Sequence, residues 1–303
     1  MRILHVDTGR ELRGGQRQAL LLAHGLGERG HQQAILARRN SPLYAAARER
    51  GLATLPLSWA ALAREARRAD LIHAHDARAH TLAALLGGGR PLVVSRRVAF
   101  PVRGGLLSRS KYRRVTRFLA VSEFVRERLR EAGIPAEKIS IVYDGVAPPA
   151  LGPSVPREPF ALAPASDDPQ KGSDLAAEAC RAAGMELRFS AALEDDLPRA
   201  WLFLYLTRSE GLGSAILLAM AHRTPVIASR VGGIPEIVAD GFTGLLVEND
   251  AEAVAAAIRD VLADPAGAAD RAEAAYAGLL ARFTDAIMVA QTEQAYRLAL
   301  DAK

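Results

Sequence analysis

The sequence is poor in cysteine and contains no long apolar stretch. Its single cysteine, Cys180, can form neither an internal disulfide nor a thiolate metal cluster, which indicates a reducing compartment. No apolar run reaches the roughly 18 to 20 residues that a membrane-spanning helix needs. The opening residues Met1–Asp7 are typical of a buried strand and not of a signal peptide. We therefore expect a cytoplasmic protein, either soluble or peripheral on the inner face of the membrane.

Two kinds of binding motif are also missing. The three spaced glycines of a dinucleotide-binding fingerprint are absent, which argues against a dehydrogenase. No nucleic-acid recognition motif or aromatic stacking platform accompanies the basic residues, so no nucleic-acid partner is expected.

The positive charge is concentrated in the first half of the chain. Residues 1–150 hold 26 Lys and Arg against 12 Asp and Glu, a balance of +14, whereas residues 151–303 hold 13 against 22, a balance of −9. This asymmetry predicts that the first half faces something anionic, such as a membrane surface or a phosphorylated acceptor. The alternative is that the charge reflects codon bias and not a function. Only four of the 39 basic residues are lysine, and the chain is rich in Arg and Ala.

The apolar residues follow an alternation of short buried strands and amphipathic helices. With 303 residues, 50% apolar and 24% charged, the chain is long enough for two folded domains. Strands are predicted at Arg2–Val6, Gln33–Ala37, Leu71–Ala74, Leu92–Ser95, Phe118–Val121, Ile139–Val142, Phe160–Ala163, Leu187–Ser190, Trp201–Leu206, Pro225–Ala228 and Gly244–Val247. Helices are predicted at Gln16–Arg29, Leu43–Arg50, Ala60–Arg68, Arg78–Leu86, Glu123–Ala132, Ser173–Ala183, Ser214–His222, Ile234–Ala239 and Ala251–Leu262, with a long closing stretch from Ala268. This order predicts an α/β protein with doubly wound parallel sheets.

A proline-rich segment divides the chain. Five of its 16 prolines fall within residues 147–159, where they forbid a regular strand ladder. We expect a first domain over 1–147, a linker over 148–159, a second domain over 160–282 and a closing helix over 283–303. Because ligands gather at the carboxyl ends of parallel strands, two such domains would bind them in the cleft between them.

Glycines stand where strands pass into helices. Gly14 and Gly15 follow the first strand, which suits the approach of an anion or sugar to backbone N–H groups, although a tight turn is the plainer interpretation. A richer pattern begins after the strand at 201–206, where a carboxylate, two glycines and an apolar helix follow one another. It reads Ser209-Glu210-Gly211-Leu212-Gly213-Ser214, and Gly232-Gly233-Ile234-Pro235-Glu236 follows it. Its backbone donors could hold a diphosphate while Glu210 accepts a hydrogen bond from a hydroxyl.

This pattern resembles the retaining glycosyltransferases of the GT-B fold, in particular glycosyltransferase family 4. The resemblance extends over nearly the whole chain. It includes the segments Asp70–Asp76, Phe118–Ser122 and Ile134–Gly145, the pair Lys171-Gly172, and the closing helix Phe283–Leu298. It implies two facing Rossmann-like domains with an interdomain cleft.

Three departures from the family pattern concern the second domain. Ser166 stands where the family usually carries an Arg that helps to clamp the diphosphate. Leu218 replaces the second Glu, which normally binds the ribose. Only 39 positions separate Lys171 from Glu210. The family usually has roughly another strand and helix in this interval, about 30 residues or more. The second domain is therefore expected to be shortened.

The resemblance implies a metal-independent enzyme without a resident cofactor. It would move a sugar, with retention, from a nucleotide-diphosphate sugar to a lipid-linked, phosphorylated or saccharide acceptor in glycan or lipopolysaccharide-type biosynthesis. Glu210 would orient the donor sugar, while Lys171 and the amides of Gly211, Leu212, Gly213 and Ser214 would hold the diphosphate. Two other classes remain open: a glycosyltransferase-like binding protein that has lost turnover, and a GT-B epimerase or phosphorylase. The oligomeric state is left open.

The first domain offers further candidates. Arg96 and Arg97 stand where the family often has a His, and two guanidiniums there could grip a phosphate or carboxylate, or lie solvated beside a loop.

His75 either contacts a sugar or is itself a structural residue, and His73 is expected in the core. The basic and apolar segment Arg103–Leu119 could lie on an anionic membrane or be an ordinary amphipathic helix.

Overall fold

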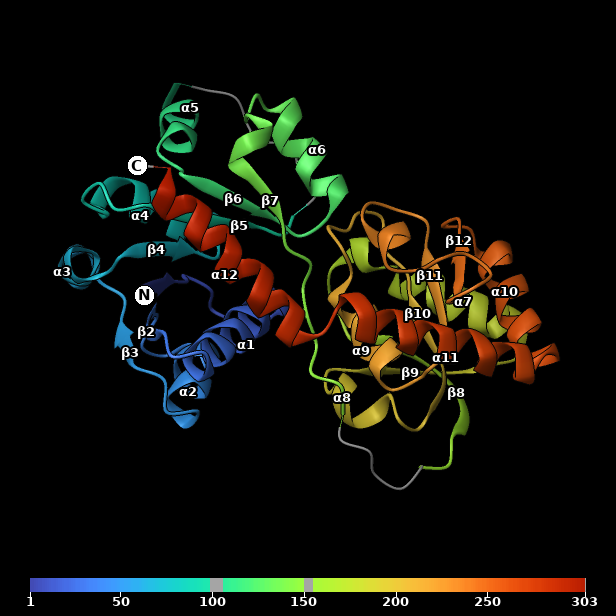
Figure 1. Cartoon of the computed structure of the whole chain (residues 1–303). Helices are drawn as coiled ribbons and strands as arrows, with labels where there is room; N and C mark the ends of the chain where they lie inside the picture. The colour runs from blue at the N-terminus through green and yellow to red at the C-terminus, as the bar shows by residue number, and fades with distance from the viewer. Residues whose placement is uncertain (99–105, 150–154, 303) are drawn as a thin grey trace. The chain divides into compact units, whose positions relative to one another are not determined.

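The computed structural model describes residues 1–98, 106–149 and 155–302, and side chains are described for these residues except 106–109. The chain divides into two compact units (Figure 1). The N-terminal unit comprises Met1–Asp144 and Asp285–Lys303, and the C-terminal unit comprises Gly145–Thr284. Residues 150–154 of the predicted linker and the start of the basic segment at 103–105 lie outside the described residues. Within the described part of the chain, no helix combines the length and apolar character needed to cross a bilayer.

The N-terminal unit is built on a seven-stranded parallel sheet in the order β3-β2-β1-β4-β5-β6-β7. Its strands are β1 (Arg2–Val6), β2 (Gln32–Ala37), β3 (Thr54–Pro56), β4 (Leu71–Ala74), β5 (Leu92–Arg96), β6 (Arg117–Ala120) and β7 (Ile139–Ile141). The central strands are apolar without alternation because helices cover both faces of the sheet.

The helices of this unit begin at residues that can cap them. They are α1 (Gly14–Glu28), α2 (Pro42–Glu49), α3 (Trp59–Arg68), α4 (Ala77–Leu86), α5 (Leu106–Arg113), α6 (Glu123–Glu131) and α12 (Asp285–Asp301). Ser41, Ser58, Asp76 and Ser122 accept hydrogen bonds from the first turns of α2, α3, α4 and α6. The first turn of α1, by contrast, has no side-chain cap at Arg13.

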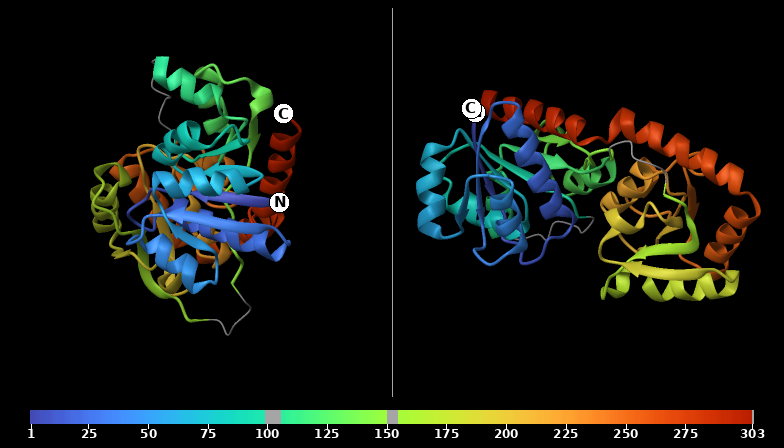
Figure 2. Two further views of the ribbon diagram at one scale, coloured as in Figure 1. Left: turned by 90° about the vertical axis from the view of Figure 1, so that its left-hand side faces the viewer. Right: turned by 90° about the horizontal axis from the view of Figure 1, so that it is seen from below.

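The C-terminal helix α12 packs beside α1 on one face of the N-terminal sheet (Figures 1 and 2). Met288, Val289 and Tyr296 of α12 share a buried cluster with Ile3 of β1 and Leu71 of β4. The last residues of the chain thus help to form the core of its first unit.

The C-terminal unit has a five-stranded parallel sheet in the order β12-β11-β10-β8-β9. Its strands are β8 (Glu158–Pro164), β9 (Glu186–Ser190), β10 (Ala200–Tyr205), β11 (Val226–Ser229) and β12 (Leu245–Val247). Its helices are α7 (Ser173–Ala183), α8 (Leu193–Asp196), α9 (Ser214–Ala221), α10 (Ala251–Ala263) and α11 (Pro265–Arg282). The interval between Lys171 and Glu210 contains α7, β9, α8 and β10, and α8 has only four residues.

The predicted doubly wound α/β fold is confirmed, but individual elements differ. The helix predicted at Ile234–Ala239 is wrong: Ile234–Glu236 is a single 3-10 turn. The amide of Ile237 donates to the carbonyl of Ile234, three residues earlier, and the chain then passes into a bridge between Asp240 and Gly244. The closing stretch is two helices, because α11 ends at Arg282 and α12 begins at Asp285. The short strand β3 and the helix α8 were not predicted.

Candidate active site

The carboxyl end of β10 brings together the two charged residues that the sequence motif singled out. Lys171 Nζ lies 2.8 Å from Glu210 Oε2, although the two residues are far apart in the sequence. The Tyr205 hydroxyl donates a hydrogen bond to the same oxygen at 2.5 Å. Glu210 is thus held by a cation and a phenol, which fixes the direction of its carboxylate.

Tyr205 is a buried partner that no sequence argument identified. Its side chain is only 8% exposed. Burial, followed by the negative charge of Glu210, raises the pKa of the Tyr205 hydroxyl well above its usual range. The phenol therefore stays protonated and acts as a hydrogen-bond donor. The ammonium group of Lys171 also lies 5.7 Å from the centre of the Tyr205 ring, within the range of a cation–π contact.

The Gly232-Gly233 pair fixes the backbone of Glu210. Gly232 has φ of +57°, and a Cβ atom at this position would lie 1.9 Å from the carbonyl oxygen of Glu210. The amide of Gly233 donates to that same carbonyl. Only glycine at position 232 allows this approach, which explains why the two parts of the motif occur together.

The predicted diphosphate amides lie at the start of α9, and one of them already has a partner. The amide of Gly211 donates to Glu210 Oε1 at 3.0 Å. Gly213, with φ of +100°, precedes the first residue of α9, Ser214, and supplies no side-chain cap. Leu212 is a core residue with 1% exposure, so only its backbone could serve a ligand. The N-terminus of α9 is a favourable place for negative charge.

A cavity of about 400 Å³ lies next to this cluster, at the same edge of the sheet. Ser166, the residue in place of the expected Arg, lines it, and so does Arg208, which follows β10. The amide of Arg208 donates to the carbonyl of Gln170, the neighbour of Lys171. The other charged residues that line the cavity are acidic: Asp167, Asp168, Asp174 and Glu178. A phosphate here would need cations close to it.

Leu218 lies on the open side of α9. Ser214, Ala215 and Leu218 are half-buried, whereas Ile216, Leu217, Ala219 and Met220 are buried. Residues spaced by three and four positions share one face of a helix. Position 218, where the family usually has its second Glu, therefore does not belong to the buried core.

In the N-terminal unit, Arg97 lies beside the predicted glycine turn. Its Nε donates to Asp144 Oδ1 at 2.9 Å, and its Cδ lies 3.8 Å from the position of a Cβ atom at Gly15. Gly14 and Gly15 form the first turn of α1, and neither has a positive φ. These glycines are therefore not required by the backbone conformation. Their lack of a side chain leaves space in which a ligand could approach the backbone.

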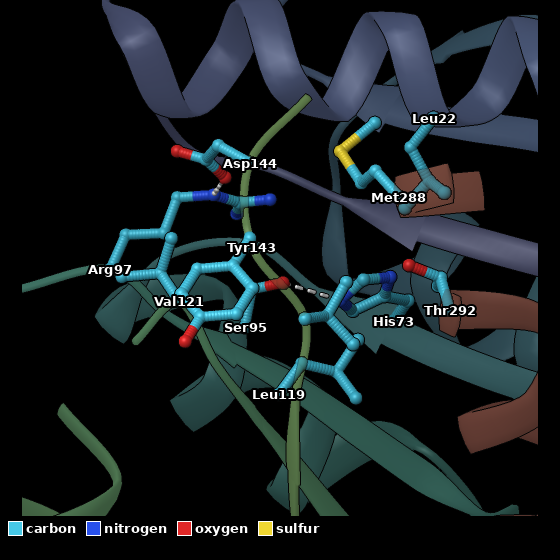
Figure 3. A pocket seen from close by; sticks show the side chains of 11 residues that line it. Leu22, His73, Ser95, Arg97, Leu119, Val121, Tyr143, Asp144, Met288 and Thr292 are labelled. Carbon is cyan, nitrogen blue, oxygen red and sulfur yellow. Dashed lines mark hydrogen bonds and ion pairs between the residues drawn. The ribbon is translucent and has the colours of Figure 1, made fainter. Parts of the chain in front are cut away.

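Arg97 also borders a small cavity of about 10 Å³, enough for a single water molecule (Figure 3). Figure 3 shows its ion pair with Asp144 and the hydrogen bond between His73 and Ser95. The Nη1 atom of Arg97 is buried without a hydrogen-bond partner among the described residues. Such an atom is suited to an oxygen of a ligand.

The expectation that Arg96 and Arg97 grip one anion together is wrong. Side chains alternate along a strand, and Arg97 shares a face with Ser95, whose hydroxyl contacts His73. Arg96 lies on the opposite face, where its charge adds to burial, the main cause, in lowering the pKa of His80 and Lys111. The two guanidiniums therefore face different surroundings.

Three histidines meet near the carboxyl edge of the N-terminal sheet. His5 of β1 and His73 of β4 are neighbours in register, and His75 follows β4. His73 is completely buried and contacts the Tyr296 hydroxyl at 2.6 Å, which confirms that it belongs to the core. Burial lowers the pKa of all three side chains, that of His5 to about 4, so each ring is neutral near pH 7.

Among the residues that the structure describes, these three histidines are spaced closely enough to bind a metal ion. One possible ligand atom from each lies within 4.8 Å of the others. His5 Nδ1 and His75 Nε2 are only 2.9 Å apart and share a hydrogen bond. Tetrahedral zinc with bonds of about 2.0 to 2.1 Å would hold its ligand nitrogens farther apart, at roughly 3.3 Å. The positive charge of Arg97 also acts on His73 and His75. His5 and His75 are thus arranged as hydrogen-bond partners, and His73 bonds to Tyr296 and Ser95 instead.

The described part of the basic segment packs into its own unit. Tyr112 stacks on Phe118, which is 1% exposed. Lys111 donates to the Thr81 hydroxyl, and Arg117 donates to the Ser140 hydroxyl. These apolar side chains therefore cover the sheet, and several of the bases bind neighbouring protein atoms.

The sequence reasoning also missed Asp7, directly after β1. It is 2% exposed and accepts hydrogen bonds from the amide of Gly9 and the side chain of Gln16. Burial raises the pKa of its carboxyl group. Its place at a strand end was the signal that could have drawn attention to it, as it did for His75.

The fold is that of GT-B glycosyltransferases, and family models match both units. The model for Glycosyltransferase Family 4 matches residues 12–148, and the model for Glycosyl transferases group 1 matches residues 156–264. The chain therefore belongs to this family of glycosyltransferases. The predicted resemblance to glycosyltransferase family 4 and to the GT-B fold is confirmed.

Its similarity to individual members is local in sequence and extensive in structure. Alpha-maltose-1-phosphate synthase of Mycolicibacterium smegmatis is 41% identical over 112 residues, which are 35% of this chain and 29% of that protein. A GDP-mannose-dependent phosphatidylinositol monomannoside mannosyltransferase of the same organism is 51% identical over 61 residues, 20% of this chain and 16% of that protein. The structure of Anabaena HepE in complex with UDP and glucose aligns with a TM-score of 0.86 at 18% identity, covering 98% of this chain and 99% of that one.

Proposed function

We propose that this protein transfers a sugar from a nucleotide-diphosphate sugar to an acceptor, with retention and without a metal ion. The observation that carries the proposal is the contact of Lys171 and Tyr205 with Glu210 at the start of α9. A cation, a fixed carboxylate and a helix N-terminus are the groups that a diphosphate and an adjoining sugar require.

Each residue has a defined task in this proposal. Lys171 contacts a phosphate of the donor, and the amides at the start of α9 stabilise the negative charge that develops on the departing diphosphate. Glu210, oriented by Tyr205, accepts hydrogen bonds from the donor sugar. Arg208 supplies the positive charge that Ser166 cannot, since both residues line one cavity.

The N-terminal unit is proposed to hold the acceptor. Arg97, Gly14, Gly15 and His75 lie at or near the carboxyl edge of its sheet, and Arg97 offers an unpartnered Nη1 atom to an acceptor phosphate or carboxylate. The mannosyltransferase similar in sequence acts, by its name, on a phosphatidylinositol monomannoside, which favours a lipid-linked acceptor in cell-envelope glycan synthesis.

The positive N-terminal unit is accordingly proposed to bind the cytoplasmic surface of an anionic membrane. Screening limits the reach of exposed charges to about 8 Å at physiological salt, so this binding should weaken as salt rises. Flotation with phosphatidylglycerol vesicles, against neutral phosphatidylcholine vesicles, tests it. Equal recovery with both would contradict a membrane partner.

A second candidate function is binding without turnover. Ser166 and Leu218 favour it, because each lacks a charged group that would hold the donor. The similarity to HepE favours transfer, since that chain has nearly the same extent as this one and its structure contains UDP and glucose.

A panel of nucleotide sugars separates the two functions. Ligands that bind the native state raise its melting temperature by mass action, and turnover releases the free nucleoside diphosphate. If the protein is a transferase, we expect both a thermal shift and release of the nucleoside diphosphate. EDTA should not affect this release. NMR of the product should show the same anomeric configuration as the donor. A thermal shift without release in the presence of candidate acceptors would favour the binding protein.

A further inference from the structure

The three histidines form an ordered array that the proposed roles do not explain. His5 and His73 project from the same face of the sheet as Ile3 and Leu71, as the strand register shows. His75, two residues beyond His73, lies with its ring centre 4.0 Å from that of His73 and 5.2 Å from that of His5. His75 is 7% exposed, so its orientation is set by these neighbours.

The first hydrogen bond of the array determines where His5 carries its hydrogen. His5 Nε2 lies 2.6 Å from Gln33 Oε1. An amide oxygen can only accept, so Nε2 is the donor. Because the buried His5 ring is neutral, its Nδ1 atom has no hydrogen and must act as an acceptor.

The second hydrogen bond, between His5 and His75, determines the tautomer of His75. His75 Nε2 lies 2.9 Å from His5 Nδ1 and has to donate to it. The neutral His75 ring therefore carries its hydrogen on Nε2, and its Nδ1 atom has a lone pair. This Nδ1 atom is buried and has no partner among the described residues.

His73 does not satisfy that lone pair. Its Nδ1 atom contacts the Tyr296 hydroxyl and its Nε2 atom contacts the Ser95 hydroxyl, so both nitrogens are engaged elsewhere. The positive charge of Arg97 lowers the pKa of His75 further, after burial and its two histidine neighbours. His75 is thus kept as a neutral acceptor, and a buried acceptor without a partner normally has a ligand or water to serve.

We propose that Gln33 and His5 are positioning residues that hold His75 as the Nε2-H tautomer, so that His75 Nδ1 accepts a hydrogen bond from a sugar hydroxyl of the acceptor. This inference rests on the proposed function, because it assigns the orphan atom to a sugar hydroxyl. A carbohydrate is suited to this atom since every hydroxyl can donate one hydrogen bond.

Nitrogen-15 NMR of the histidine-labelled protein tests the tautomers without any turnover. His5 and His75 should each show a protonated Nε2 and an unprotonated Nδ1, with signals assigned by their loss in His5→Gln and His75→Gln. Saturation with free glucose or mannose, as sugar probes of the acceptor site, should shift the His75 Nδ1 signal, whereas UDP or GDP alone should not. A protonated Nδ1 on His75, or an equal shift with the nucleotide alone, would overturn the proposal.

Three substitutions separate positioning from folding. Gln33→Leu removes the amide oxygen and should mix the tautomers of His75, with a loss of roughly 2- to 10-fold in kcat/KM for the acceptor. Gln33→Glu retains an acceptor for His5 Nε2 and should restore the tautomer. Gln32→Leu changes the exposed neighbouring position and should alter neither the tautomer nor the rate.

The outcomes distinguish this inference from the proposed function. If Gln33→Leu changes neither the His75 signals nor the rate, the positioning role is wrong although transfer stands. If the wild-type protein neither binds nor turns over any nucleotide sugar, the proposed function fails, and the sugar contact of His75 fails with it. The NMR pattern then still decides whether Gln33 and His5 set the tautomer.

Discussion

Lys171 and Glu210 form an ion pair of 2.8 Å in the C-terminal unit, and the Tyr205 hydroxyl contacts the same carboxylate oxygen. The side chain of Lys171 is 34% exposed and that of Glu210 is 16% exposed, so the pair is partly shielded from water. In the proposed function, a donor phosphate would compete with Glu210 for the ammonium group. The residues proposed to bind the phosphate and the sugar of the donor are thus in contact with each other before it arrives.

Lys171→Ala should weaken donor binding. Loss of one hydrogen bond to a charged group costs about 1.5 to 3 kcal/mol, hence roughly 10- to 150-fold in affinity or kcat/KM. Calorimetric titration with UDP-glucose and GDP-mannose measures it. Lys171→Arg, which keeps the charge, should lose less. Unchanged binding and turnover in Lys171→Ala would show that the donor lies elsewhere.

Tyr205→Phe should lower turnover more than donor binding. The ring and its packing remain, but Glu210 loses the hydroxyl donor that directs it, which we expect to reduce kcat about 10-fold. Steady-state kinetics separate kcat from KM. Tyr276→Phe is the matched control, because the Tyr276 ring stacks under Arg223 in the same unit and should function without its hydroxyl. Equal rates for wild type and Tyr205→Phe would remove Tyr205 from the site.

Arg208→Ala should weaken binding of UDP or GDP about 10-fold, and more strongly at low salt. Among the described residues, no hydrogen bond or ion pair engages its guanidinium group. Adding Ser166→Arg to this variant should recover affinity, because positions 166 and 208 line the same cavity. Arg181→Ala, on the exposed side of α7, provides the control. Failure of Ser166→Arg to rescue would separate the cavity from the phosphate site.

Leu218→Glu should strengthen nucleotide binding, by roughly 10-fold or more if a ribose diol donates to the new carboxylate. The half-buried position on the open side of α9 allows the charge to remain hydrated without the donor. Ala215→Glu, one turn earlier on the same side, tests whether the position matters. A stable Leu218→Glu variant that binds no nucleotide would favour the binding-protein alternative.

Stability should fall as the pH drops from about 7 toward 4. In the unfolded chain His5 binds a proton near its ordinary pKa of 6.5, but in the folded chain it does so only near 4. The unfolded state therefore takes up more protons across this window, and the free energy of unfolding falls by about 3 kcal/mol from His5. Urea unfolding at pH 7 and pH 5 measures the slope.

Two variants test whether His5 causes the pH dependence of the free energy of unfolding. His5→Gln should flatten the dependence on pH, although it also lowers stability at pH 7. His24→Gln should leave the slope unchanged, since the His24 side chain is 54% exposed. An equal slope in wild type and His5→Gln would show that burial of His5 does not govern acid stability.

The order of elements and the chemical motif could be read from the sequence because both depend on local patterns. Apolar runs located most strands of both sheets, and the bounds of α7 were predicted correctly. The motif around Glu210 indicated the family, which the comparisons confirm. It also marked Lys171 as a partner in the same site, and the two side chains are in contact.

Where local patterns were ambiguous, the sequence interpretation failed. Ile234, Ile237 and Val238 have helical spacing, but they are buried around a single 3-10 turn. The adjacent arginines Arg96 and Arg97 suggested one anion clamp, although strand alternation sends them to opposite faces.

The sequence by itself determined the fold class, the family and the charged residues of the candidate site, because periodicity and motif spacing are properties of neighbouring residues. Only the tertiary structure decided which side chains act on those residues. Tyr205 meets Glu210, Gly232 admits the Glu210 carbonyl, and Gln33 reaches His75 through His5. These contacts depend on the parallel pairing of strands and on the loops at their carboxyl ends, which bring distant residues within hydrogen-bond distance.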